Sequence, residues 1–156
     1  MDIVDHATRS RMMSGIRGTN TKIEVTLRHA LHRRGFRYRL HCRDLPGRPD
    51  IVLPKYQVAI FVHGCFWHGH TCALFKTPKT RTQFWLDKID SNRRRDLVAS
   101  ERLLEKGWRL AVIWECALRS QPEHTLELLV DRISTWLKDS DATQLLEIPS
   151  PSIQDK

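Results

Sequence analysis

Three short apolar runs, set between segments of helical periodicity, constrain the fold of this chain most. The runs are 50–53, 58–62 and 109–114, and short runs without polar alternation are typical of strands buried on both faces. A capping-box pattern at Thr21–Glu24 opens a helix that ends at Gly35, and residues 81–106 and 123–138 also have helical spacing. Strands flanked by helices in this way predict one α/β domain with a central sheet.

The remaining segments give weaker signals. Residues 36–40 alternate apolar and polar side chains, which favours a half-buried strand, and residues 45–49 have the composition of a turn. Residues 63–80 show no periodicity. We expect no regular structure after Ser140.

Positive charge is concentrated in the amino-terminal two thirds of the chain. The formal net charge is +8, with eleven Lys and Arg against five Asp and Glu in residues 1–50 and ten against five in residues 76–109. A basic body attracts polyanions, above all nucleic acid. Because no apolar run reaches the roughly 18 residues of a membrane span, and the first residues lack the order of a signal peptide, we expect a cytoplasmic protein that associates with DNA.

The segment HGCFWHGHTC at residues 63–72 carries the strongest chemical signal. Zinc binds thiolate and imidazole in a tetrahedron, and disulfides are rare in the cytosol. The spacing predicts a structural zinc site with the ligands Cys65, His70, Cys72 and Cys116. His63 and His68 are competing imidazoles, and a set of unrelated free thiols is the alternative.

A carboxylate precedes one predicted buried strand, and the next predicted strand ends close by. Asp50 follows a Pro, and the second strand ends at Val62–His63. Nucleases often hold Mg²⁺ with a carboxylate at a strand start, because hard cations prefer oxygen and bridge carboxylate to phosphate. A turn-capping role explains Asp50 equally well. Glu24, at the third position of its helix, is predicted to cap the backbone or to face this metal site.

Histidines and aromatic residues in the same region suggest further roles. His63 and His68 are candidates for general acid or base, because imidazole titrates near neutral pH. Phe66 and Trp67 lie between the predicted zinc ligands, where a rigid loop can present rings as wedges between base pairs instead of burying them in the core. Trp85 is a further candidate for such a wedge, and Met13 is a candidate for a flexible apolar side chain that enters a groove of the DNA.

Taken together, these segments resemble the Vsr-type very-short-patch-repair DNA mismatch endonucleases. The resemblance runs from about residue 7 to residue 138 and includes LPGRPD (45–50), FVHGCFWH (61–68), TRTQFWLDKI (80–89) and WECALR (114–119). It implies a restriction-endonuclease-like fold of the PD-(D/E)xK type, a central mixed sheet flanked by helices, with a structural zinc site. It also implies Mg²⁺-dependent nicking of one strand, 5′ to the thymine of a T·G mismatch that arises when 5-methylcytosine deaminates.

The resemblance also implies roles for individual residues. Asp50 and the backbone carbonyl of Val62 would hold Mg²⁺, although the family commonly has a threonine at the latter position. His68 would be the acid/base residue, with His63 as a helper at the scissile phosphate and Glu24 as an auxiliary residue. The zinc ligands agree with the spacing argument. The implied DNA contacts are Phe66, Trp67, Trp85, Met13, Lys88 and Asn92.

For the whole chain we expect a DNA-contacting arm at residues 1–18, an endonuclease domain at 19–140 and a flexible tail at 141–156. A single asymmetric lesion as target suits a monomer, and contacts with other mismatch-repair proteins are left open by the sequence. A noncatalytic zinc-stabilised DNA-binding module is an alternative, but it leaves Asp50 and the two histidines unexplained. A zinc hydrolase of small substrates is a third interpretation, and it leaves the basic surface unexplained.

Overall fold

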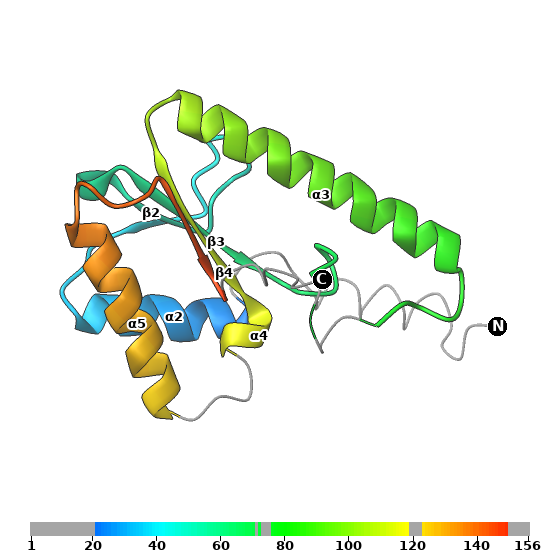
Figure 1. Cartoon of the computed structure of the whole chain (residues 1–156), viewed down its shortest axis with the longest axis horizontal. Helices are drawn as coiled ribbons and strands as arrows, with labels where there is room; N and C mark the ends of the chain where they lie inside the picture. Colours follow the sequence, from blue (N-terminus) through cyan, green and yellow to red (C-terminus); the bar gives the residue numbers. More distant parts are fainter. Residues whose placement is uncertain (1–20, 71, 73–75, 119–122, 150–156) are drawn as a thin grey trace, which may run out of the picture.

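The computed structural model describes residues 21–70, 72, 76–118 and 123–149, which form a five-stranded mixed sheet with helices on both faces (Figure 1). The strand order is β1-β2-β3-β4-β5. β1, β2 and β3 pair antiparallel, whereas β3, β4 and β5 pair parallel. The strands are β1 (Arg39–Leu40), β2 (Ile51–Leu53), β3 (Val58–His63), β4 (Arg109–Trp114) and β5 (Leu145–Ile148). The expected α/β class with a mixed sheet is confirmed.

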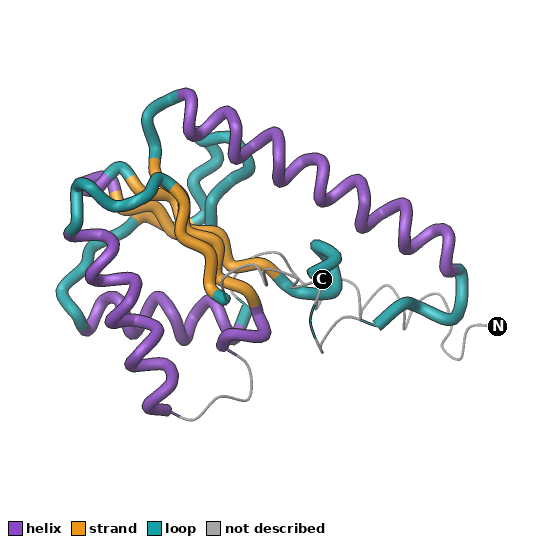
Figure 2. Tube along the Cα trace, in the orientation of Figure 1, coloured by secondary structure: helices purple, strands orange, loops and turns teal. Residues whose placement is uncertain are grey.

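Helices cover the sheet unequally on its two faces (Figure 2). Helices α2 (Lys22–Arg33) and α5 (Glu123–Lys138) cover one face, and α3 (Thr82–Glu105) crosses the other. Two short helical turns, η1 (Pro54–Tyr56) and α4 (Glu115–Leu118), follow β2 and β4. Because both faces are covered, the central strands are apolar on both sides, which explains the unbroken apolar runs in the sequence.

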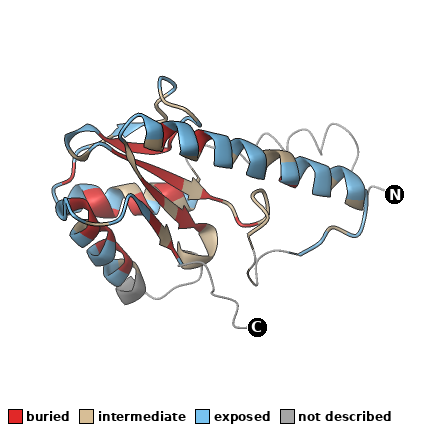
Figure 3. Cartoon of the chain, turned by 45° about the horizontal axis from the view of Figure 1, so that its top comes forward, coloured by how far each residue is buried: buried red, intermediate tan, exposed pale blue. Residues whose placement is uncertain are grey.

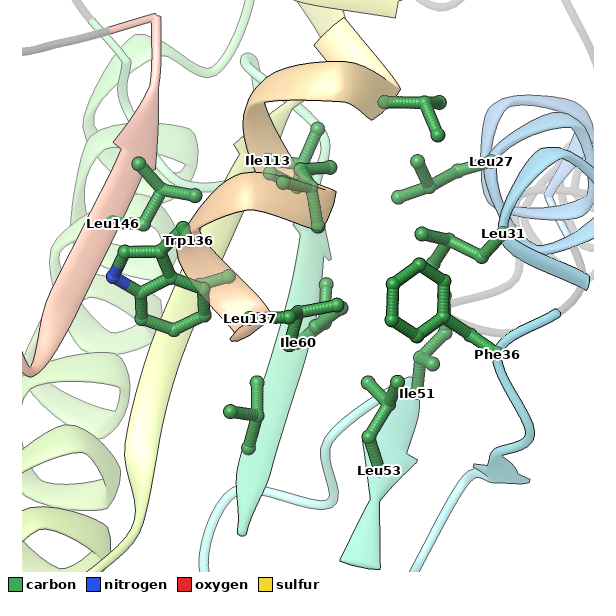
Figure 4. Close-up of a cluster of buried hydrophobic side chains, with 14 of the residues drawn as sticks. Leu27, Leu31, Phe36, Ile51, Leu53, Ile60, Ile113, Trp136, Leu137 and Leu146 are labelled. Atoms are coloured by element: carbon green, nitrogen blue, oxygen red, sulfur yellow. The ribbon is translucent and has the colours of Figure 1, made fainter. Parts of the chain in front are cut away.

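The main core lies between the sheet and the α2–α5 layer (Figure 4). Leu27 and Leu31 of α2 meet Ile60 and Ile113 of the central strands, and all four side chains are 0% exposed. A smaller cluster on the other face contains Ala59, Phe61, Leu103 and Leu110. Burial of these side chains fixes the position of α2 and α3 relative to the end of β3.

The predicted amino-terminal cap of α2 is present, as the first of the two hydrogen bonds of a capping box. The side-chain oxygen of Thr21 accepts a hydrogen bond from the backbone N–H of Glu24 at 3.3 Å. The helix ends before Gly35, whose φ of +94° is in the left-handed region that glycine adopts without strain. These two signals fix both ends of the helix within a residue or two of the predicted ends.

Two predictions about strands need correction. We expected no regular structure after Ser140, but β5 pairs with β4 over Leu145–Ile148, with Leu146 and Ile148 buried. A four-residue strand at a sheet edge is stabilised by its pairing and leaves little periodicity in the sequence. The strand expected over residues 36–40 is reduced to Arg39–Leu40. The proposed arm at residues 1–18 lies outside the described residues.

Helix α3 is longer than the sheet is wide, and its amino-terminal half projects beyond the sheet (Figure 1). Most of that half is exposed (Figure 3). Trp85, Lys88, Asn92 and Asp96 follow one another at intervals of three or four residues and therefore lie along one side of the helix. No helix in the described part of the chain is long and apolar enough to cross a membrane.

Candidate functional site

Within the described residues, three groups of potential ligands gather around the carboxyl end of β3 and the loop that follows it. In each group the ligand atoms lie within 4.8 Å of one another. The groups are a carboxylate cluster (Glu24, His41, Asp50), a histidine pair with an acid (His63, His68, Asp96) and a thiol cluster (Cys65, His70, Cys72, Cys116). The fold therefore brings together side chains from α2, α3, α4 and the strands.

Asp50 anchors the carboxylate cluster beside β3. It lies just before β2, is 8% exposed, and its Oδ2 accepts a hydrogen bond from the backbone N–H of Val62 at 2.7 Å. Burial, followed by the charge of nearby Glu24, raises the pKa of Asp50 to about 7, although the Val62 hydrogen bond opposes the shift. Two buried carboxylates therefore lie close together, and their oxygens are the ligands that a hard cation prefers.

The side chain of Glu24 lies in the carboxylate cluster, which is the second of the two roles considered from the sequence. Its backbone N–H is capped by Thr21, while its carboxylate, in a residue 1% exposed, enters the cluster. Its Oε2 lies 2.8 Å from Nε2 of His41 and 3.1 Å from Nη1 of Arg28. Sequence reasoning missed His41, because only the antiparallel pairing of β1 with β2 returns this residue to Asp50.

The histidine pair begins at His63, the last residue of β3, which directly follows the Val62 that binds Asp50. The rings of His63 and His68 stack with their centroids 4.0 Å apart and an angle of 8° between their planes. Burial, followed by the charge of His68, lowers the pKa of His63 to about 3, so this imidazole is neutral. Its Nδ1 is buried and has no hydrogen-bond partner among the described residues.

Asp96 of α3 holds the second imidazole of the pair. Its carboxylate accepts a hydrogen bond from Nδ1 of His68, and its other oxygen lies 4.0 Å from Nε2 of His63. A carboxylate bound to Nδ1 fixes the tautomer and leaves Nε2 of His68 free to accept a proton. Asp96 was not predicted from the sequence, although it follows the predicted DNA contact Asn92 by four residues and therefore lies on the same side of α3.

The thiol cluster has the dimensions of a tetrahedral metal site. Nδ1 of His70 lies 3.5 Å from Sγ of Cys65 and 3.6 Å from Sγ of Cys116. Zinc bonds of about 2.3 Å to sulfur and 2.0–2.1 Å to nitrogen place the two ligand atoms about 3.6 Å apart in a tetrahedron. Cys72 completes the group, and all four cysteines of the chain are free thiols. Burial raises the pKa of the Cys65 and Cys116 thiols, which a bound cation would reverse.

Trp114, at the end of β4, joins the thiol cluster to the histidine pair. Its ring stacks on His70 at 4.1 Å and meets the edge of His63 at 5.2 Å. Its Nε1–H donates to the carboxylate of Glu147 on β5 at 2.8 Å. β5, which the sequence did not predict, therefore holds the Trp114 ring in place between the thiol cluster and the histidine pair.

The aromatic residues expected to contact DNA form one cluster between the loop and α3. Phe66, Trp67 and Trp85 are half-buried and meet edge to face, with centroids 5.2 to 5.9 Å apart. Asn92 donates from Nδ2 to the backbone oxygen of Trp67 at 2.8 Å, which ties the loop to α3. Lys88 is exposed on the same helix. Met13 lies outside the described residues.

Gly69 lets the loop approach α3 closely. Its φ is +61°, and a Cβ at this position would lie 2.8 Å from Cγ2 of Ile89. A larger residue would have to displace the helix or the loop. Backbone conformation and packing thus hold the loop in addition to the thiol cluster.

Replacing Asp50 with Asn should stabilise the metal-free protein at high pH. Because burial raises the folded-state pKa of Asp50 from 3.8 to about 7, the carboxylate opposes folding progressively as pH rises from 4 to 7. The Asn variant should gain up to about 4 kcal/mol in unfolding free energy at pH 8 and almost nothing at pH 4. Urea unfolding of both proteins without added divalent cations measures this gain, and an equal gain at both pH values would contradict the explanation.

Comparison with known proteins connects this geometry to an enzyme family. The family described as DNA mismatch endonuclease Vsr matches residues 1–74. The chain is 45% identical to DNA mismatch endonuclease Vsr of Escherichia coli (strain K12) over 146 residues, which cover 94% of each protein. It is also 48% identical over 110 residues, 70% of this chain and 81% of the relative, to the type II nicking enzyme V.XorIIP of Xanthomonas oryzae pv. oryzae. The buried carboxylates, the paired histidines and the thiol cluster therefore belong to a chain of the Vsr family of DNA mismatch endonucleases.

Proposed function

We propose that this chain nicks one strand of duplex DNA 5′ to the thymine of a T·G mismatch, by Mg²⁺-dependent phosphodiester hydrolysis in very-short-patch repair. The observation that carries the proposal is the convergence of a buried carboxylate pair and an acid-bound histidine pair at the end of β3. Membership of a mismatch-endonuclease family supports the same reaction. The fold that we assign is the restriction-endonuclease-like type. The catalytic domain extends beyond the residues 19–140 expected from the sequence, because β5 (Leu145–Ile148) belongs to the central sheet.

The carboxylate cluster fits Mg²⁺ by its donor chemistry. Asp50 and the carbonyl of Val62 would hold the ion, with Glu24 beside them. Both acids are buried, and the raised pKa of Asp50 shows that negative charge there is poorly compensated by the protein alone. When bound, Mg²⁺ supplies charge that stabilises the pentavalent phosphate and lowers the pKa of bound water.

The histidine pair supplies proton transfer and phosphate binding. His68 accepts the proton of the attacking water at Nε2, because Nδ1 is held by Asp96. His63 stays neutral and is the helper beside the scissile phosphate. Stacking of the two rings keeps the two imidazoles in a fixed relation. Asp96 is thus a positioning residue for the proton transfer.

The thiol cluster fits Zn²⁺, and the likeness of its distances to tetrahedral geometry supports this assignment. Cys65, His70 and Cys72 come from the loop, and Cys116 comes from α4. A structural ion there holds the loop that carries both the aromatic wedge and His68. Recognition and chemistry are then connected through a short segment of chain.

The proposed substrate is double-stranded DNA with a T·G mismatch, bound by a monomer. Phe66, Trp67 and Trp85 form the wedge, which enters the mismatched step because this step costs less to unstack than a paired one. Lys88 and Asn92 lie on the same side of α3 and contact the nucleic acid. We assign Met13, from the arm at residues 1–18, as the counterpart of this wedge.

A nicking assay on matched and mismatched duplexes tests the reaction. The wild-type chain should nick the T·G strand only with Mg²⁺, and Asp50→Asn should reduce the rate by at least about 1000-fold, because metal binding and phosphate stabilisation are lost together. Binding of the variant to the same duplex should change less than threefold. A variant that binds and nicks like the wild type would refute the role of Asp50, and a wild-type chain that binds without nicking would favour the noncatalytic module.

Metal analysis of the purified protein tests the thiol cluster. We expect one zinc per chain in the wild type and a large loss of zinc in Cys116→Ala, because a tetrahedral site with three ligands binds far more weakly. Cys42→Ala is the matched control, since Cys42 is outside the cluster and should keep its full zinc content. Wild-type protein without zinc would end this assignment.

The wedge can be tested by separating discrimination from affinity. Trp67→Ala should reduce the preference for T·G over T·A duplex about tenfold, because stacking on a base is worth about 1–3 kcal/mol. Nonspecific affinity should change less, and Trp67→Phe should keep most of the preference because it retains a ring. Competition binding without Mg²⁺ measures both quantities, and unchanged preference in Trp67→Ala would exclude the wedge.

A further inference from the structure

We infer that His41 is a positioning residue of the carboxylate cluster, which holds Glu24 beside Asp50 and so determines how tightly the cluster binds its divalent cation. The inference rests on the proposed function, because it assigns a role at the same metal site. It starts from a contact that the sequence did not reveal, between a residue just after β1 and a buried acid of α2.

His41 contacts both chain segments that supply the carboxylates. Its backbone N–H donates to the backbone oxygen of Asp50 at 3.0 Å. Its ring nitrogen Nε2 lies 2.8 Å from Oε2 of Glu24, and because a carboxylate accepts, the nitrogen donates. One residue therefore connects α2 to the segment before β2 at the level of the two acids.

The backbone of His41 is held in an unfavourable conformation. Its φ of +50° is in the left-handed region, which is unfavourable for a residue with a Cβ. Such a conformation persists where surrounding contacts determine it, and here those contacts are the two hydrogen bonds to the acid-bearing segments. The left-handed turn directs the chain so that one residue makes both.

Arg28 cannot replace this connection. Its Nη1 lies 3.1 Å from the same Oε2 of Glu24, but both residues belong to α2 and are four positions apart. This contact orients the carboxylate within the helix and leaves the distance between the helix and Asp50 unconstrained. His41 approaches from the sheet, so it constrains that distance directly.

The contact of His41 with Glu24 favours a positioning role over direct ligation. Mg²⁺ prefers oxygen ligands, and Nε2 of His41 already donates to Glu24. Direct nitrogen ligation would instead favour metals such as Zn²⁺ or Ni²⁺ over Mg²⁺. Groups that hold a metal-site carboxylate from outside typically change metal affinity or activity by 10- to 100-fold when they are removed.

The test compares full-length wild type with His41→Ala, His41→Gln, Glu24→Gln and the double variant Glu24→Gln/His41→Ala. Mn²⁺ alone is the binding probe, followed by electron paramagnetic resonance without DNA, and the Mg²⁺ concentration for half-maximal nicking is the second readout. His29→Ala is the control, because His29 is an exposed histidine of α2 outside all three groups. Circular dichroism melting confirms that each variant is folded at the assay temperature.

We expect His41→Ala to weaken Mn²⁺ binding and raise the required Mg²⁺ concentration about 10- to 100-fold. His41→Gln, whose amide can donate to Glu24, should restore most of both and also remains informative if the Ala variant is unstable. In the Glu24→Gln background, His41→Ala should add less than twofold, because His41 acts through Glu24. His29→Ala should behave as wild type.

Three results would overturn the inference: wild-type behaviour of His41→Ala in both readouts, independent losses in the double variant, or failure of folded His41→Gln to recover. Failure of the Gln variant, together with an undiminished loss of binding from His41→Ala in the Glu24→Gln background, would identify His41 as a direct ligand instead. A wild-type chain that binds Mn²⁺ through His41 and Glu24 but does not nick would overturn the proposed reaction while supporting the positioning role.

Discussion

The parallel register between β3 and β4 is the constraint on which the rest of the site depends. It pairs His63 with Trp114, the last residues of the two strands. Cys65 and Cys116 each come two residues later, so the register brings them to the same place, where the N–H of Cys116 donates to Sγ of Cys65 at 3.3 Å. A shift by one position would separate the thiols and turn Trp114 away from both imidazoles.

Burial shifts the pKa values of Asp50 and His63 and also lowers the free energy of unfolding. The same low-dielectric surroundings raise the pKa of Asp50 and lower that of His63, so one acid and one base are both held toward their neutral forms. The main core between the sheet and the α2–α5 layer offsets this cost.

The elements that sequence predicted best are those whose signal is local. The capping box of α2, the apolar runs of β2, β3 and β4, and the spacing of α3 all depend on neighbours within a few turns. Likewise, the thiol cluster was accessible because three of its members lie within eight residues of one another. Local patterns of this kind need no knowledge of the tertiary fold.

The residues that sequence reasoning missed are brought to the site by tertiary contacts. His41 returns to Asp50 through a two-residue strand pairing, Asp96 reaches His68 from α3, and Glu147 meets Trp114 from an edge strand. Each is an ordinary polar residue in its own segment. Their importance depends on where the sheet and helices end relative to one another, which no local pattern records.

Helix α3 carries Trp85 near its free end and Asp96 eleven residues further along, a separation of about 16 Å at 1.5 Å per residue. The ring at one end touches the loop aromatics, and the carboxylate at the other orients the imidazole. Because an α-helix is stiff along its axis, a shift of α3 along that axis would displace Trp85 and the Asp96 partner of His68 by the same distance. The position of the aromatic cluster and the orientation of the histidine pair are thus both set by the same helix.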